Sequence, residues 1–195
     1  MVLFNVNTGC PVDLAFVFDS SDTIGVGALG DAKMLVKKMV KGLELGADES
    51  RVALVVFADK VEVKARFSEN LSVKQFQDMV QNMKSIGSRT RIDKALVETK
   101  QVFKEGRDDV YKIAVVLTDG IQSEDHDTKS LLSTSEPLRR AGVRVIAVAI
   151  GTRASKGRLR LMTDSMDDVK EEDEALEYFQ QLSDKLNQNL CGNYC

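Results

Sequence analysis

The stretch VDLAFVFDSSDT, residues 12–23, decides how the rest of the chain is interpreted. Its first part is rich in Val and Phe and carries apolar side chains on both faces. Such a segment is typical of a strand that lies in a parallel sheet with helices above and below it. The strand then ends abruptly at Asp19, which is followed at alternate positions by the hydroxyl side chains of Ser21 and Thr23. We therefore expect a polar site at the carboxyl end of a buried strand.

The remaining segments alternate between strand-like and helix-like patterns. Further apolar runs predict buried strands at 51–58, 112–118 and 143–150. The alternating segment VEVKARF, at 61–67, closely follows one of them and predicts an antiparallel partner at a sheet edge. Between the strands we expect helices at about 26–45, 72–84, 92–104, 129–141 and 174–190. This order predicts an α/β fold: a doubly wound, mostly parallel central sheet with one antiparallel edge strand and helices on both faces.

Length and charge narrow the classes of function. The 195 residues suit a single domain, which we place at 1–195 with a core of about 11–190. The formal net charge of −3 argues against nucleic acid as a partner. No apolar run approaches the length that spans a bilayer, so we expect no membrane insertion. The first residues lack a signal-peptide pattern, which leaves either an intracellular protein or a domain excised from a larger one.

Three loops are predicted to converge at one edge of the sheet. They are the segment after Asp19, the Gly/Ser-rich loop SIGSRTRID at 85–93 with Thr90, and the turn LTDG at 117–120 with Asp119. In doubly wound sheets, ligands bind outside the carboxyl ends of the strands at the point where the strand order reverses. The helix expected to start near Ile24 adds the positive end of its dipole, which favours an anion.

The side chains at this edge form an all-oxygen set. Two carboxylates (Asp19 and Asp119) and three hydroxyls (Ser21, Thr23 and Thr90) suit a hard cation such as Mg²⁺. A hydroxyl ligand adds no charge, so the ion would keep net positive charge and would attract one more anionic ligand. The pattern therefore favours a site that captures a carboxylate from outside the domain.

The motif and the surrounding segments resemble the von Willebrand factor type A family. Asp19-x-Ser21-x-Thr23, Thr90 and Asp119 are similar to that family's metal-ion-dependent adhesion site, the MIDAS motif. The resemblance extends over almost the whole chain, through VDLAFVFDSS, ADESRVALVVFADKVEV, IDKAL, KIAVVLTDG, LRRAGVRVIAVAIG and DVKEEDEALEYFQQLSDKL. It implies a Rossmann-like fold and a non-enzymatic module for adhesion or matrix assembly, similar to the modules of matrilins and type VI collagen.

The resemblance also implies a role for each site residue. Ser21 and Thr23 would bind the metal directly, Thr90 would do so when a ligand is engaged, and Asp19 and Asp119 would act directly or through water. The expected ion is Mg²⁺, with Mn²⁺ or Ca²⁺ as alternatives. The implied partner presents an acidic side chain and belongs to collagen, another matrix protein or a cell-surface receptor.

Two departures from the family pattern concern this same edge. Thr23 replaces the usual Ser and adds a methyl group beside the ion, whereas Arg89 and Arg91 flank Thr90 where smaller residues are usual. The arginines could attract acidic ligands or could repel the cation. We expect them, together with Ser20 and Asp22, on the rim that a partner contacts.

The cysteines favour an extracellular domain of a larger protein. Cys10 lies before the first strand, and Cys191 and Cys195 close the chain. A Cys10–Cys191 bond would join the two ends of the domain, as in oxidised extracellular modules, and would leave Cys195 for an intermolecular disulfide. Three reduced thiols in a cytosolic protein are the alternative. The sequon at Asn70 permits glycosylation.

Other interpretations remain open. Asp19 and Ser21 could cap a helix, Thr90 could begin one, and Asp119-Gly120 is a common turn dipeptide. A metal-independent scaffold of the same fold is an alternative function. A haloacid-dehalogenase-like phosphatase is a weaker one, because a hydroxyl replaces the titratable acid that its motif needs two residues after Asp19. The acidic run at 124–127 lacks a regular calcium-ligand spacing, and its His126 is expected in a solvated loop.

Overall fold

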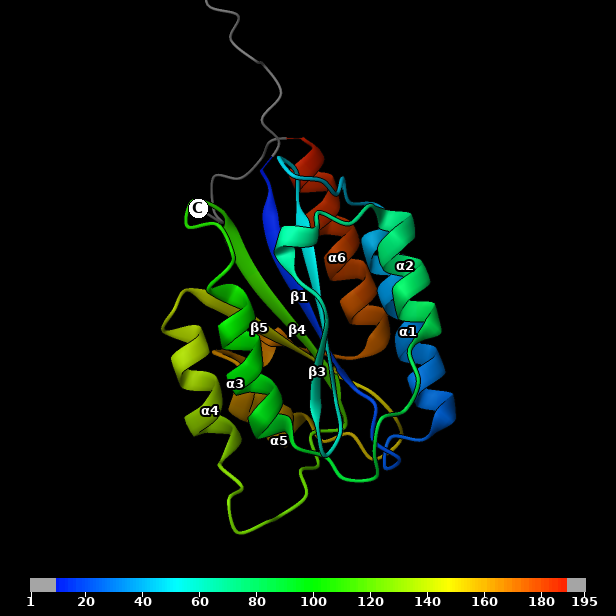
Figure 1. Cartoon of the computed structure of the whole chain (residues 1–195), viewed down its shortest axis with the longest axis vertical. Coiled ribbons are helices and arrows are strands. Elements are labelled where there is room, and N and C mark those ends of the chain that lie inside the picture. The colour runs from blue at the N-terminus through cyan, green and yellow to red at the C-terminus, as the bar shows by residue number, and fades with distance from the viewer. Residues whose placement is uncertain (1–9, 189–195) are drawn as a thin grey trace, which may run out of the picture.

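The computed structural model describes residues 10–188, and its strands form a six-stranded sheet (Figure 1). The order across the sheet is β3-β2-β1-β4-β5-β6. All neighbouring strands are parallel except β2 and β3, which are antiparallel. The predicted α/β class with one antiparallel edge strand is therefore confirmed. The strands are β1 (Val12–Asp19), β2 (Arg51–Phe57), β3 (Val61–Ala65), β4 (Tyr111–Thr118), β5 (Val143–Ala149) and β6 (Val169–Lys170).

Two layers of helices cover the sheet (Figure 1). Helices α1, α2 and α6 pack on one face, and α3, α4 and the short α5 pack on the other. Three single 3-10 turns complete the described elements. The bounds are α1 (Val26–Val40), η1 (Phe67–Glu69), α2 (Val73–Asn82), α3 (Ile92–Phe103), α4 (Leu131–Arg139), α5 (Lys156–Leu159), η2 (Arg160–Met162), η3 (Met166–Asp168) and α6 (Glu172–Asn187).

Strand β1 contributes side chains to both halves of the core, because successive side chains of a strand point to opposite faces. Leu14, Phe16 and Phe18 pack against the layer of α1, α2 and α6, whereas Ala15 and Val17 pack against the layer of α3 and α4. All five are fully buried. The apolar character of both faces, which the sequence already showed, thus follows from the central position of β1.

Phe16 links three elements of the first layer. Its ring centroid lies 5.5 Å from that of Phe76 in α2 and 6.3 Å from that of Phe179 in α6. Burying one such aromatic side chain contributes about 1.5–3 kcal/mol. These contacts hold α2 and α6 against the strand that ends at the candidate site.

The observed helix bounds differ from the predicted ones at two places. The helix expected over 26–45 ends at Val40, because α6 packs closely against the chain at Gly42. A Cβ atom at Gly42 would lie 2.7 Å from Ser183 Oγ, and that hydroxyl donates to the Gly42 carbonyl. The last helix begins at Glu172 after a capping box formed by Glu171 and Glu174, and its predicted end at 190 lies outside the described residues.

The carboxyl ends of β1 and β4 meet at the centre of one sheet edge. Helix α1 follows β1 on one face and α4 follows β4 on the other, so the strand order reverses between them. This is the position at which open α/β sheets bind ligands. Within residues 10–188, no helix combines the length and apolarity that a membrane span requires.

Candidate metal centre

Asp19 is the last residue of β1, and its side chain is 1% exposed. Its Oδ1 accepts hydrogen bonds from Ser21 Oγ at 2.6 Å and from the Ser21 amide at 3.1 Å, and its Oδ2 accepts one from Thr118 Oγ1 at 2.7 Å. Burial raises the pKa of Asp19 to about 6, and nearby Asp119 adds to the rise, although these hydrogen bonds oppose it. Its charge has no ion-pair partner among residues 10–188, so a cation would stabilise it.

Three hydroxyl oxygens form a triangle beside this carboxylate. Ser21 Oγ lies 2.8 Å from Thr23 Oγ1, Thr23 Oγ1 lies 3.0 Å from Thr90 Oγ1, and Thr90 Oγ1 donates to Ser21 Oγ at 2.9 Å. Ser21 and Thr90 are buried, whereas Thr23 is exposed. The structure therefore brings together hydroxyls that are up to 69 positions apart in the sequence.

Backbone contacts fix the first two loops against each other. Ser21 and Gly87 form an isolated parallel bridge, and the Asp22 amide donates to the Gly87 carbonyl at 3.0 Å. A Cβ atom at Gly87 would lie 1.8 Å from Asp59 Oδ1 and 3.2 Å from Ala58 Cβ. The close approach of Gly87 to Ala58 and Asp59 therefore requires a residue without a side chain. The loop that carries Thr90 is thus held against the one that carries Ser21 and Thr23.

The loop that follows β4 holds the backbone of Thr90. The Thr90 amide donates to Ser123 Oγ at 3.1 Å, and the Ser123 amide donates to the Thr90 carbonyl at 2.9 Å. This reciprocal pair connects the second and third loops of the site. Sequence reasoning did not identify Ser123, and a hydroxyl in a polar loop gives no distinctive signal.

Asp119 follows β4 and is 2% exposed. Its Oδ1 accepts a hydrogen bond from the Ile121 amide at 2.8 Å, and its Oδ2 lies 3.5 Å from Arg153 Nη2. The same guanidinium nitrogen donates to the Thr23 carbonyl at 2.6 Å. Arg153 was not predicted as a site residue, although its place just after β5 puts it at the same sheet edge.

The donor set fits a small hard cation. Magnesium–oxygen distances of 2.0–2.1 Å place adjacent ligands of a regular octahedron about 2.8–3.0 Å apart. The three hydroxyl separations, 2.8, 2.9 and 3.0 Å, match one face of such an octahedron. Six-coordinate calcium would need separations of about 3.3–3.7 Å. Residues 10–188 contain no group of three or more His, Cys, Asp or Glu side chains that could hold a metal.

Two of the four predicted rim residues are buried, which corrects that part of the prediction. Ser20 is inaccessible, and its Oγ donates to the Phe57 carbonyl at 3.1 Å. Arg91 is 3% exposed and forms ion pairs of 2.8 Å with both Asp93 and Asp127. Both side chains are engaged inside the domain, so neither is available to a partner at this surface.

The other two rim candidates, Asp22 and Arg89, are exposed. Asp22 Oδ1 accepts a hydrogen bond from Ser85 Oγ at 3.1 Å, and Arg89 pairs with Asp125 at 2.6 Å. Asp125 and Asp127 of the acidic run thus form ion pairs with arginines. His126 lies exposed in its loop, as expected.

Comparisons with known proteins agree with this architecture. The family model described as "von Willebrand factor type A domain" matches residues 13–185. Human collagen alpha-6(VI) chain is 32% identical over 163 residues, which are 78% of this chain and 7% of that protein. Chicken matrilin-1 is 21% identical over 93% of this chain and 37% of its own length. The chain therefore spans well under half the length of these relatives.

Solved structures show the same fold. Proximal thread matrix protein 1 from the mussel byssus superposes with a TM-score of 0.75 at 25% identity, over 91% of this chain and 46% of that one. A structure of the same mussel protein with a zinc-occupied MIDAS motif superposes with a TM-score of 0.73 at 22% identity, over 95% and 49% of the two chains. On the family model and on the similarity to collagen VI, the chain belongs to the von Willebrand factor type A domain family.

Proposed function

We propose that this domain is a non-enzymatic binding module of the extracellular matrix or cell surface. It binds an acidic side chain of a protein partner through a divalent cation at the carboxyl edge of the sheet. The observation that carries the proposal is the triangle of Ser21, Thr23 and Thr90 hydroxyls beside the buried carboxylates of Asp19 and Asp119. Neutral ligands leave such a cation with charge to share with an external anion.

The residues of the chain have distinct parts in this function. Ser21, Thr23 and Thr90 would supply neutral oxygens, and Asp19 and Asp119 would supply negative charge directly or through water. The cation, when bound, supplies the positive charge that holds a partner carboxylate. The hydroxyl separations favour Mg²⁺ or Mn²⁺ over Ca²⁺. The zinc in the mussel protein's MIDAS motif supports a divalent ion at the same place in the fold.

The relatives support a matrix partner. Their names identify collagen chains, matrilins and a byssal thread matrix protein, so collagen or another matrix protein is the class of partner we propose. The disulfide that we propose at Cys10 would suit an oxidising, extracellular setting. Its proposed partner Cys191 and the proposed intermolecular Cys195 lie outside the described residues. Asn70 is exposed, as a glycosylation site requires.

A metal-independent interaction scaffold is a second candidate. The observation that favours it is that the Ser21 hydroxyl donates to Asp19 and lies within hydrogen-bond distance of both Thr23 and Thr90, so these hydroxyls have partners without a cation. The distances that suit an octahedral face also suit O–H···O hydrogen bonds. The two candidates differ in whether binding requires the ion.

Calorimetric titration of the chelator-treated domain with Mg²⁺ and Mn²⁺, followed by binding to immobilised collagen, tests the proposal. Thr90→Ala should weaken metal binding, whereas Ser68→Ala, at an exposed hydroxyl of η1, should not. Collagen binding that is lost in EDTA and restored by Mg²⁺ would support the bridging function. Binding that is unchanged in EDTA would refute it and would favour the scaffold.

A further inference from the structure

One segment of the rim, residues 150–158, carries two arginines beside the candidate metal centre. The Ser155 amide donates to the Asp119 carbonyl at 3.2 Å, which ties this segment to the end of β4. Arg153 contacts Asp119 Oδ2 and the Thr23 carbonyl, yet its side chain remains 55% exposed. Arg153 therefore places positive charge at the edge of the site while part of its guanidinium stays open to solvent.

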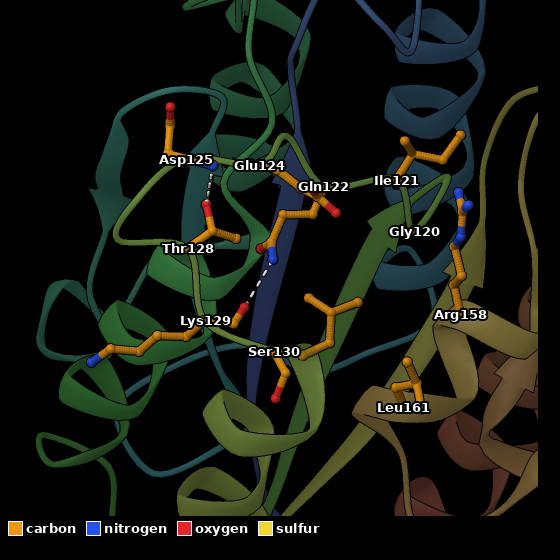
Figure 2. Close-up of a pocket in the computed structure, with 11 residues that line it drawn as sticks. Gly120, Ile121, Gln122, Glu124, Asp125, Thr128, Lys129, Ser130, Arg158 and Leu161 are labelled. Atoms are coloured by element: carbon orange, nitrogen blue, oxygen red, sulfur yellow. Dashed lines mark hydrogen bonds between the residues drawn. The ribbon is translucent and has the colours of Figure 1, made fainter.

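Arg158 lies one turn further on, beside the residue that follows Asp119. A Cβ atom at Gly120 would lie 3.3 Å from Arg158 Cβ, so Arg158 lies close to Gly120. Figure 2 shows the Arg158 side chain rising next to Gly120 and Ile121 at one wall of a cavity of about 570 Å³. The Arg158 side chain is exposed, and its guanidinium has neither a hydrogen bond nor an ion pair within the described part of the chain. Its charge is available to a ligand.

The cavity beside Arg158 extends from Gly120 and Ile121, which follow Asp119, to Ser130 and Leu131 at the start of α4 (Figure 2). Ile121, Leu131 and Leu161 give it an apolar lining, and the side chain of Lys129 extends at the opposite wall. Of its two acidic residues, Asp125 is paired with Arg89. The other charged residues of the lining are Glu124, Lys129 and Arg158, and none of their side chains forms an ion pair in the described part of the chain.

The other flank of the metal centre has the opposite charge. A cavity of about 600 Å³ between α1 and the start of α6 is lined by Asp31, Glu171, Glu172 and Asp173. Lys156 pairs with Glu171 at 3.1 Å, but Asp31, Glu172 and Asp173 have no ion pair among residues 10–188. An acidic segment that leaves the metal would be repelled on this flank and attracted on the α5 flank.

We propose that the partner presents two acidic groups close together, one to the metal and the second to Arg153 and Arg158. This inference rests on the proposed function, because the first group is the one that the cation holds. The second group would form charge-assisted hydrogen bonds with guanidiniums that carry free donors. The partner recognised by the rim is then an acidic stretch, rather than an isolated acidic residue in a neutral or basic sequence.

Blocked tetrapeptides test the proposal on the Mg²⁺-loaded domain by NMR titration. One peptide carries a single glutamate among glycines, one carries two glutamates at adjacent or alternate positions, and one carries a glutamate and a lysine. Because exposed ion pairs are modest, we expect the two-glutamate peptide to bind about threefold to tenfold more tightly than the single-glutamate peptide. The glutamate–lysine peptide should bind most weakly.

Arginine variants test whether Arg153 and Arg158 cause the higher affinity for the two-glutamate peptide. Arg158→Gln should remove most of the advantage of the second glutamate and leave the affinity for the single-glutamate peptide unchanged. Arg140→Gln is the matched control, since Arg140 is exposed at the C-terminal end of α4, pairs with Glu136 and does not line the cavity. Arg153→Gln should also reduce the advantage, and its Mg²⁺ affinity is measured separately because Arg153 contacts Thr23 and Asp119.

The possible outcomes separate this inference from the function on which it rests. Equal affinity for the one- and two-glutamate peptides, or a gain that survives in the Arg153→Gln/Arg158→Gln double variant, would overturn the inference and leave the metal bridge intact. Single-glutamate binding that is unaffected by EDTA would refute the metal bridge. A two-glutamate gain that persists in EDTA and requires Arg158 would show that the arginines bind the acidic peptide without the metal bridge.

Discussion

Replacing Asp19 by Asn should stabilise the metal-free domain at neutral pH and abolish its metal binding. Burial raises the pKa of Asp19 from 3.8 to about 6. The carboxyl therefore binds its proton more tightly in the folded domain than in the unfolded chain, and the free energy of unfolding falls as the pH rises from 3.8 through 6. At about 1.4 kcal/mol for each pKa unit, the ionised carboxylate destabilises the metal-free fold by about 3 kcal/mol above pH 7.

Asparagine removes this charge and keeps the shape of the side chain. Its Oδ1 can still accept the hydrogen bonds from Ser21, and its amide can donate to Thr118 Oγ1 if that hydroxyl rotates. Urea titration in EDTA should show the free energy of unfolding of Asp19→Asn raised by about 1–3 kcal/mol at pH 7.5 and nearly unchanged at pH 4. Asp22→Asn, at an exposed position in the same loop, should match the wild type at both pH values.

Added Mg²⁺ should reverse the order of the two proteins. A ligand at about one thousand times its dissociation constant stabilises the folded state by about 4.1 kcal/mol, which exceeds the predicted advantage of the variant, and only the wild type should gain this. A variant that is no more stable than the wild type at pH 7.5 in EDTA would refute the argument that burial of charge makes Asp19 unfavourable. A gain of equal size at pH 4 and pH 7.5 would refute it as well, because packing would then explain the effect.

Three further predictions concern the same edge of the sheet. Thr90→Ala should weaken Mg²⁺ binding about tenfold or more, and Thr90→Ser should restore most of it, as measured by calorimetry; equal affinities would remove Thr90 from the metal shell. Arg91→Gln should lower the free energy of unfolding by about 3–5 kcal/mol, because it leaves Asp93 buried and unpaired. Arg89→Gln should change the free energy of unfolding by less than about 1 kcal/mol. Urea titration measures both, and equal losses in the two variants would contradict the burial of Arg91. Mg²⁺ affinity should fall about tenfold between pH 7.5 and pH 5, because only about one Asp19 carboxyl in eleven is ionised at the lower pH; a flat profile would exclude Asp19 as the titrating group.

The parts of the site that sequence reasoning placed correctly depend on strand geometry. Buried parallel strands are apolar on both faces, so the first polar residue after each marks the same sheet edge. Asp19 and Asp119 follow two such strands, which explains why they lie together across the centre of the sheet. Thr90 was placed because its loop also ends at this edge, before a helix. No contact between side chains was needed for any of these three positions.

The parts that sequence reasoning missed depend on contacts between distant segments. Arg89 and Arg91 are two residues apart in a polar loop, yet one is exposed and the other buried. Arg91 is buried because it pairs with Asp93 on its own helix and with Asp127, 36 positions later. Local pattern cannot distinguish these two arginines. Likewise α5 has four residues, too few to show a helical period, so the position of Arg158 could not be predicted.

Burial of the Asp19 carboxylate has opposite effects on the stability of the metal-free fold and on cation binding. In the metal-free domain its ionised carboxylate is buried without an ion-pair partner among residues 10–188, which opposes folding at neutral pH. The same burial excludes water and leaves the carboxylate oxygens directed by Ser21 and Thr118, which strengthens their attraction for a cation. A residue that weakens the metal-free fold thus acts as an anchor for the ion. The stabilisation gained on adding Mg²⁺ should therefore be large at pH 7.5 and should disappear near pH 4, where Asp19 is neutral and has no charge to attract the cation.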